Sequence, residues 1–204
     1  MPRHLTVAIL SLLLGMTLAA PGLCGDDEPG SSFARHASDA AYPLWLAVPA
    51  CYLFSGNGEK VETGRRIVDA MILTGAVTEL AKVTINARRP SPYEANTHGM
   101  PSGHAAISFA IAAAVGEREP DWKWPAYGTA AIIAWSRHDL RQHHWDQVIV
   151  GAALGTFLGR AAGRGRTNIW ADGDRASVSL SIAPAVAGQA LGGPMPALVY
   201  RTSF

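Results

Sequence analysis

Apolar residues recur at helical spacing over much of the chain. In residues 63–85 the apolar side chains at this spacing are Ile67, Met71, Ile72, Ala76, Leu80 and Val83. Comparable stretches cover residues 105–116, 122–136 and 145–162. Spacings of three and four residues place apolar side chains on one face of a helix, so each stretch predicts a helix packed on a core. Residues 40–58 carry no charge, but Pro43 and Pro49 interrupt them, which favours a buried or interfacial helix over a membrane span.

The pattern changes near the C-terminus. Val178, Leu180 and Ile182 alternate with serines, which is the period of a strand. Residues 188–196 are rich in turn-forming types, and the residues after them look extended. This pattern predicts a C-terminal β-hairpin, with a loose tail as the alternative. The predicted fold is therefore all-α, a bundle of about six helices with a small hairpin appended.

The distribution of charge argues against a polytopic membrane protein. The uncharged cores of the helical stretches run for about eleven to fifteen residues, short of the roughly twenty that a bilayer span needs. Asp69 and Glu79 lie inside residues 63–85, and the mean hydropathy is only +0.11. We expect a water-soluble or membrane-touching bundle, and a peripheral membrane contact stays open.

The N-terminus has the organisation of a secretory signal. Arg3 precedes an apolar run over residues 5–19, and small residues cluster up to Cys24. An uncleaved anchor helix is the alternative. We therefore predict a signal peptide in residues 1–24 and a periplasmic protein. A leader in residues 25–39 follows.

Length and composition limit the number of domains, the partners and the disulfides that we expect. A length of 204 residues fits one domain, which we place at residues 40–170, with residues 171–204 as the C-terminal extension. The formal net charge is +1, so we expect no nucleic-acid partner. Cys24 and Cys51 are the two cysteines, too few for a disulfide scaffold.

Three short clusters carry residue types that suit a phosphate group. They are Lys82 to Arg89-Pro90, the run Pro101-Ser102-Gly103-His104, and Ser136-Arg137 followed by His143. A transferring phosphoryl group spreads negative charge over three oxygens, and Lys and Arg side chains can neutralise that charge. A Ser-Gly pair at the start of a helix adds a hydroxyl and backbone N–H groups that bind anions.

In order and spacing these clusters resemble the signature of the type 2 phosphatidic acid phosphatase superfamily. That signature reads K-x6-RP, then PSGH, then SR-x5-H-x3-D. Bacterial acid phosphatases, lipid phosphate phosphatases and vanadium haloperoxidases share it. This chain differs from the signature at its last residue. Gln147 stands where the family has Asp, and Asp146 comes one position earlier.

The resemblance implies a role for each matching residue. His143 would be the nucleophile that forms a phosphohistidine, and His104 would protonate the leaving alkoxide and then activate water. The phosphate would be held by Lys82, Arg89, Ser102, Gly103 and Arg137. Asp146 or Gln147 would hold the second nitrogen of His143, and we favour Asp146 because an anion stabilises imidazolium. No metal or cofactor is expected, since three cations already face the phosphate.

The expected function is therefore metal-independent hydrolysis of a phosphate monoester. The apolar segment 40–58 and the run His143-His144-Trp145 favour a lipid phosphate or diphosphate as substrate. A catalytically weak or inactive anion- or lipid-binding protein is the first alternative, and a vanadium-dependent haloperoxidase is a more remote one. The particular ester and the oligomeric state do not follow from the sequence.

Overall fold

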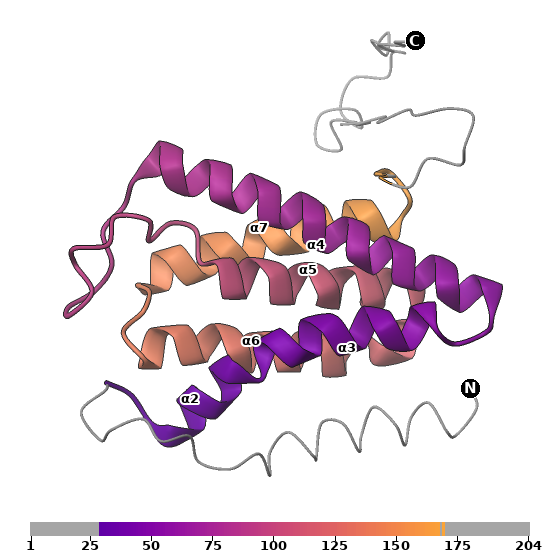
Figure 1. Cartoon of the computed structure of the whole chain (residues 1–204), viewed down its shortest axis with the longest axis horizontal. Coiled ribbons are helices and arrows are strands. Elements are labelled where there is room, and N and C mark those ends of the chain that lie inside the picture. Colours follow the sequence, from indigo (N-terminus) through magenta and orange to yellow (C-terminus); the bar gives the residue numbers. More distant parts are fainter. Residues whose placement is uncertain (1–28, 168, 170–204) are drawn as a thin grey trace, which may run out of the picture.

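A computed structural model describes residues 29–167 and residue 169 of the chain (Figure 1). In this part the chain forms six α-helices and one short 3-10 helix, with no strand. The elements are α2 (Ser32–Asp39), α3 (Ala41–Leu53), α4 (Gly58–Ile85), α5 (Gly103–Arg118), η1 (Pro120–Trp122), α6 (Lys123–Asp139) and α7 (Trp145–Gly163). The prediction of an all-α bundle of about six helices is confirmed. The predicted signal peptide and C-terminal hairpin lie outside the described residues.

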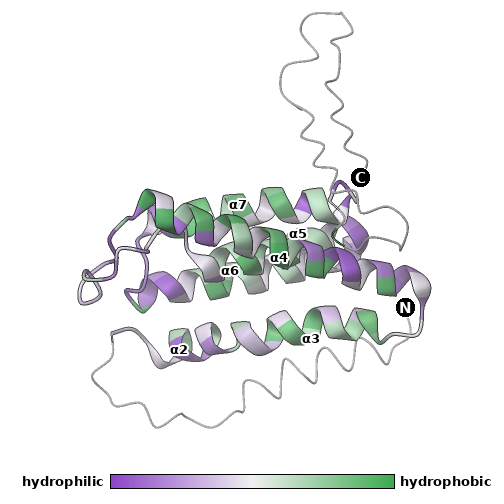
Figure 2. Ribbon diagram, turned by 45° about the horizontal axis from the view of Figure 1, so that its top comes forward, coloured by the Kyte–Doolittle hydropathy of each residue, from purple (hydrophilic) through white to green (hydrophobic). Residues whose placement is uncertain are grey.

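Helix α5 is the centre of the bundle. It packs against α4, α6 and α7, while α3 lies on α4 and α2 lies on α6. The helices run side by side (Figure 1), and hydrophobic residues dominate their middle portions (Figure 2). Successive helices α4 to α7 alternate in direction, so α4 and α6 end where α5 and α7 begin. This alternation brings distant parts of the sequence to one end of the bundle.

Small residues allow α5 and α7 to approach very closely. A Cβ atom on Gly155 would overlap the carbonyl oxygen of Ala106, and one on Gly159 would overlap that of Ala110. Because only glycine lacks a Cβ, these positions fix the register between the two helices. At the start of the pair, the Ser102 N–H donates to the Gln147 carbonyl oxygen over 3.0 Å.

Helix α4 starts earlier than the apolar pattern indicated. The side chain of Asn57 accepts hydrogen bonds from the N–H groups of Glu59 (3.0 Å) and Lys60 (3.3 Å), which caps the helix at Gly58. The first turn is polar, so a hydrophobic pattern could not detect it. The helix ends at Ile85 and carries Lys82 in its last turn.

The segment expected to be a leader is partly helical. Residues 32–39 form α2, which packs on α6 with Ala34 and Ser38 buried. The carboxylate of Asp139 accepts from the N–H of Ser31 at 2.7 Å, which ties the start of α2 to the end of α6. This part of the chain therefore belongs to the bundle.

In the residues that the structure describes, no helix combines the length and the apolar character needed to cross a membrane.

Candidate active site

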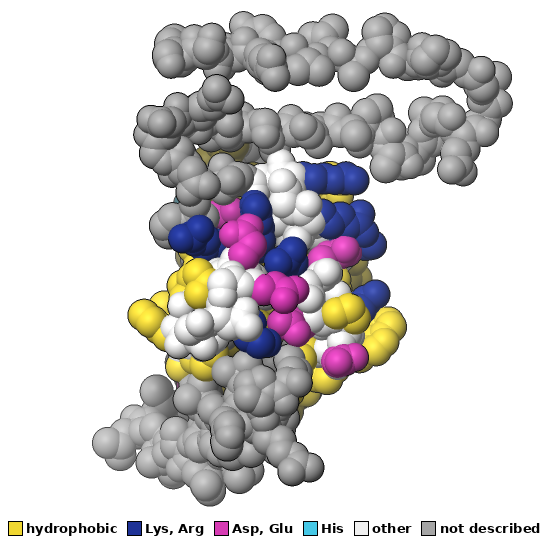
Figure 3. Space-filling model, turned by 90° about the vertical axis from the view of Figure 1, so that its right-hand side faces the viewer, with side chains coloured by type: hydrophobic (Ala, Val, Ile, Leu, Met, Phe, Trp, Pro, Cys, Tyr) yellow, Lys and Arg dark blue, Asp and Glu magenta, His cyan; other side chains and the backbone are white. Residues whose placement is uncertain are grey.

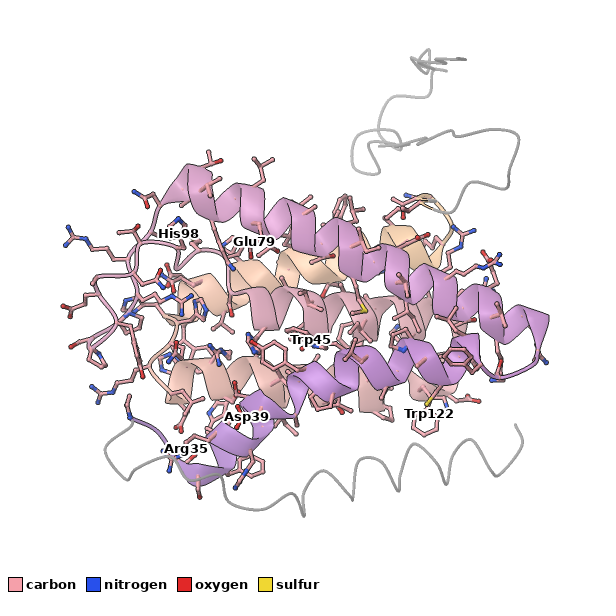
Figure 4. The ribbon with its side chains drawn as sticks, viewed as in Figure 1. Arg35, Asp39, Trp45, Glu79, His98 and Trp122 are labelled. Atoms are coloured by element: carbon pink, nitrogen blue, oxygen red, sulfur yellow. The ribbon has the colours of Figure 1, made fainter. Side chains whose placement is uncertain are left out.

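The three sequence clusters meet at one end of the bundle. Lys82 and Arg137 lie in the last turns of α4 and α6, whereas Ser102 precedes α5 and His143 lies just before α7. Nitrogen-bearing side chains crowd this end, on the left of Figure 4. Burial, and to a smaller extent the positive charges nearby, lower the pKa of His104 to about 3. The neighbours responsible are Arg137, His143, Lys82 and Arg89.

The two arginines of the site are held by neutral partners. Arg89 Nη1 donates to Gln142 Oε1 at 3.0 Å, and Arg137 Nη1 donates to Ser38 Oγ at 2.6 Å. Within the described residues, neither guanidinium has a carboxylate in salt-bridge range, and both Nε atoms are buried without a partner. Burial lowers the pKa of both groups, and the charge of Arg89 also lowers that of Arg137. Two like charges held together without a counter-ion favour a bound anion, which makes this a candidate anion site.

Ser102 and Gly103 complete this anion site at the start of α5. Ser102 occupies the N-cap position and is fully buried, yet its hydroxyl makes no capping bond and has no partner among the described residues. A Cβ atom on Gly103 would lie 3.4 Å from Lys82 Nζ, so the ammonium faces the helix start. Lys82 also pairs with Glu79 at 2.6 Å, a carboxylate whose side chain is 70% exposed. The helix start, the hydroxyl and the ammonium all favour a bound anion.

Hydrogen bonds fix the tautomer of His143. Its Nδ1 lies 2.8 Å from the carbonyl oxygen of Gly99 and 3.0 Å from Gln147 Oε1. The amide of Gln147 is oriented by its Nε2 group, which donates to the Arg88 carbonyl oxygen at 2.7 Å. Because both neighbours of Nδ1 are acceptors, Nδ1 carries the proton and Nε2 keeps a lone pair. Burial and Arg89 lower the pKa of His143 to about 4, so the ring is neutral at pH 7.

Gln147, and not Asp146, contacts the imidazole. Asp146 is exposed, whereas Gln147 is buried and sits on Nδ1. The favoured prediction about Asp146 is corrected here, because α7 begins at Trp145 and its first turn directs Gln147, and not Asp146, toward the ring. Gln147 is the third residue of the helix, so its side chain folds back toward the preceding backbone and also accepts from the His144 N–H at 3.3 Å.

Aromatic rings from α3 enclose His104. Tyr42 meets its ring edge-on and Trp45 lies against it at an angle, each with a centroid separation of 5.1 Å. The His104 Nε2 atom is buried and has no partner within the described residues.

Several contributors to the site escaped the sequence reasoning. Gly99 supplies a backbone carbonyl, and Gln142 and Ser38 hold the arginines, none of which has a sequence signal. Tyr42 and Trp45 are three residues apart in the apolar segment 40–58, and that helical spacing was the one usable signal. Among the described residues no cluster of three or more His, Cys, Asp or Glu side chains could hold a metal ion.

Comparisons with known proteins agree with this arrangement. The family model of the PAP2 superfamily matches residues 64–170, just over half of the chain. A lipid A 1-phosphatase from Porphyromonas gingivalis is 30% identical over 113 residues, which are 52% of this chain and 25% of that protein. The chain thus spans about a quarter of the length of this curated relative. No solved structure matches the chain. The family match covers all three clusters that build the site, and the chain belongs to the PAP2 superfamily.

Proposed function

We propose that this protein is a metal-independent phosphatase that hydrolyses a lipid phosphate monoester through a phosphohistidine on His143. The observation that carries the proposal is the state of His143, a neutral ring whose Nδ1 proton is held by two carbonyl oxygens. Its Nε2 lone pair is then available to a phosphorus atom bound by Arg89 and Arg137, which have no counter-ion of their own.

Substrate binding comes first. The phosphate oxygens take the place of a counter-ion for Arg89 and Arg137 and accept from the Ser102 hydroxyl and the Gly103 N–H. Lys82 approaches the same group from α4. These donors are fixed before the substrate arrives, so they stabilise the charge of the transition state without having to reorganise.

Phosphoryl transfer to His143 follows. His143 Nε2 forms a bond to phosphorus as the bond between phosphorus and the ester oxygen breaks, and His104 gives its proton to the leaving alkoxide. In the empty site burial and cations keep the pKa of His104 near 3. A bound phosphate dianion offsets those positive charges and raises the pKa of His104. Substrate binding therefore favours the protonated form of His104, which is the general acid.

Hydrolysis of the phosphoenzyme completes the cycle. Neutral His104 removes a proton from water, the water oxygen bonds to phosphorus, and the bond between phosphorus and Nε2 breaks. Inorganic phosphate leaves, and His143 returns to its neutral tautomer. Gln147 and the Gly99 carbonyl hold the ring in place throughout.

Two further observations support a lipid ester. The relative from Porphyromonas gingivalis is named for its action on lipid A. On α4, the apolar side chains of Leu80, Val83 and Ile85 are exposed on both sides of Lys82, beside the site. Such a surface can rest on a membrane while the site takes a headgroup. We further propose that the protein acts in the periplasm, as the predicted signal peptide implies.

The test is phosphate release from a panel of lipid and soluble esters by the purified full chain in the presence of a chelator. We expect turnover together with a covalently phosphorylated intermediate, and loss of both in His143→Gln. The matched control is His98→Gln, a change at an exposed histidine of the neighbouring loop (Figure 4), which should retain both. A requirement for a divalent ion, or phosphorylation that persists in His143→Gln, would contradict the mechanism.

A further inference from the structure

An apolar cavity lies beside the site, between α3, α5 and α6. Its volume is about 120 Å³. Trp45 and Trp122, both labelled in Figure 4, line it together with aliphatic side chains. The aliphatic members include Leu44, Val48, Ile111, Val115 and Ile133.

Two of the hydroxyl groups on the cavity wall are already hydrogen-bonded. The hydroxyl of Ser108 accepts from the indole N–H of Trp45 at 3.1 Å, and the hydroxyl of Thr129 donates to the Pro125 carbonyl oxygen at 3.0 Å. A water molecule in such a space would find few of the two to four partners it needs. The same shortage of partners excludes a sugar or another hydroxyl-rich ligand. The cavity suits hydrocarbon.

The cavity begins one helical turn beyond His104 on α5. His104, Ser108 and Ala112 are spaced by four residues, so they follow one another along a single face of that helix. His104 belongs to the site, whereas Ser108 and Ala112 line the cavity. Trp45 contacts the His104 ring and also lines the cavity, so the two spaces share one wall.

We propose that this cavity binds the hydrocarbon chain of the substrate, at the carbons nearest to the ester oxygen that leaves at His104. The proposal rests on the proposed function and narrows its substrate class to phosphate esters of unbranched alkyl or prenyl alcohols. Because His104 gives its proton to that oxygen, the attached chain begins near the rings of Tyr42 and Trp45, and the cavity is the apolar space that Trp45 also lines.

The size of the cavity limits how much of the chain it holds. An apolar cavity of about 150 Å³ binds benzene, so this somewhat smaller one accommodates about four carbons of one chain. Further carbons must emerge between α3 and α6, where Pro125 on the cavity rim is exposed. We therefore expect the enzyme to discriminate substrates by the first few carbons of a single chain.

The first test is a series of n-alkyl phosphates from ethyl to dodecyl, kept below the concentrations at which they aggregate. We expect kcat/KM to rise by about fourfold per added methylene over the first four or so, close to the value of burying a methylene, and then to level off. A series that is turned over at equal kcat/KM would overturn the inference and leave the phosphatase assignment standing. Failure to hydrolyse any ester, ethyl phosphate included, would instead contradict the proposed function itself.

The second test fills the cavity. Ala126→Phe places an aromatic ring in the space, and Ala131→Phe places the same ring on the exposed side of α6. We expect the ratio of kcat/KM for hexyl phosphate to that for ethyl phosphate to fall at least tenfold in Ala126→Phe and to stay unchanged in Ala131→Phe. An unchanged ratio in both variants would overturn the inference. If Ala126→Phe fails to fold, the alkyl series on the native chain still decides.

Discussion

At the end of the bundle opposite the site, basic and acidic side chains lie intermixed on the surface (Figure 3). Glu117 pairs with Arg160 and Arg164, each at 2.8 Å, and Lys60 pairs with Glu119 at 3.3 Å. At the site end, Arg89 and Arg137 have only neutral partners in the described part of the chain. One bundle therefore carries two sets of cations, one paired with carboxylates and the other held without them.

The difference between the two ends indicates what each is for. Paired surface charges cost little to keep and contribute little stability. Half-buried guanidiniums that repel each other and have no carboxylate partner are unfavourable for folding, and such groups cluster where a ligand supplies the missing charge. The unpaired cations therefore mark the functional end without reference to any motif.

The largest effect should come from removing one unpaired cation. We expect Arg137→Gln to lower kcat/KM by about 10²–10³-fold, the usual loss for one fixed donor in a charge-stabilising site. The midpoint of thermal unfolding should hold or rise, because the repulsion with Arg89 is gone. Steady-state kinetics and thermal melts check both expectations. Arg160→Gln, at the paired end, is the control and should keep its activity within about twofold. A fall in activity that merely follows unfolding would contradict this comparison.

A smaller loss should follow removal of the group that orients the nucleophile. We expect Gln147→Ala to lower kcat by about 10²-fold, because Nδ1 loses one acceptor and the ring is less well positioned. Asp146→Ala, one residue earlier and exposed, should be nearly silent.

A carboxylate in place of the amide gives a separate readout on pH. Gln147→Glu puts an anion beside the imidazole, which favours imidazolium and raises the pKa of His143. The acid limb of the pH–rate profile should therefore move to higher pH. If Asp146→Ala lowered kcat strongly and Gln147→Ala left kcat unchanged, then Asp146, and not Gln147, would be the residue that orients His143.

Acidification should weaken the site end before it affects the paired end. His104 and His143 have folded pKa values of about 3 and 4, below the ordinary 6.5 of an unfolded chain. Between pH 6.5 and 4 the unfolded state therefore binds more protons, and the free energy of unfolding falls as the pH falls. From pH 7.5 to 6 we expect a loss of about 1.5 kcal/mol, measured by denaturant titration. Added phosphate or vanadate should reduce this loss, since a bound anion raises both pKa values.

The paired end provides the contrast in the same experiment. The Arg164 and Arg160 side chains lower the pKa of Glu117 below its usual value. Its contribution is therefore complete above pH 4.5 and is lost only below that, outside the window in which the histidines act. A loss above pH 6 that anions do not reduce would show that the histidines are not its source.

The smallest effect should come from the paired end itself. We expect Glu117→Gln to lower the free energy of unfolding by less than about 1 kcal/mol, because its arginine partners are largely exposed. Catalytic activity should not change. A large loss of activity would mean that the two ends are coupled through the helices.

Most of the site could be predicted from the sequence because its chemistry is local. Lys82, Arg89, Ser102, His104, Arg137 and His143 stand in short clusters whose residue types suit a phosphate. The helical periodicity then predicted the elements that carry them. A structure was needed to show that alternating helix directions bring these clusters to one end of the bundle.

The parts of the site and fold that the sequence did not predict depend on details that hydrophobic periodicity does not contain. The choice between Asp146 and Gln147 depends on which side chain the first turn of α7 directs at His143, and periodicity does not distinguish two neighbouring positions there. The polar first turn of α4 and the short helix α2 have no long apolar stripe, so their place in the bundle was missed. The spacing of Tyr42 and Trp45 indicated that they share one face of a helix. It did not indicate their contact with His104, which lies about sixty residues later in the chain.

The close approach of α5 and α7 also determines how this protein can move. Where Gly155 and Gly159 bring the two backbones into contact, neither helix can slide without a clash, so the pair behaves as a rigid body. Ser102 and Gln147 are fixed within that body, so the start of α5 and the amide that contacts His143 keep their spacing during thermal motion. Helix α3 has far fewer contacts with α5 than α7 has, so we expect any opening for a bulky substrate to occur by displacement of α3 from α5 around Trp45.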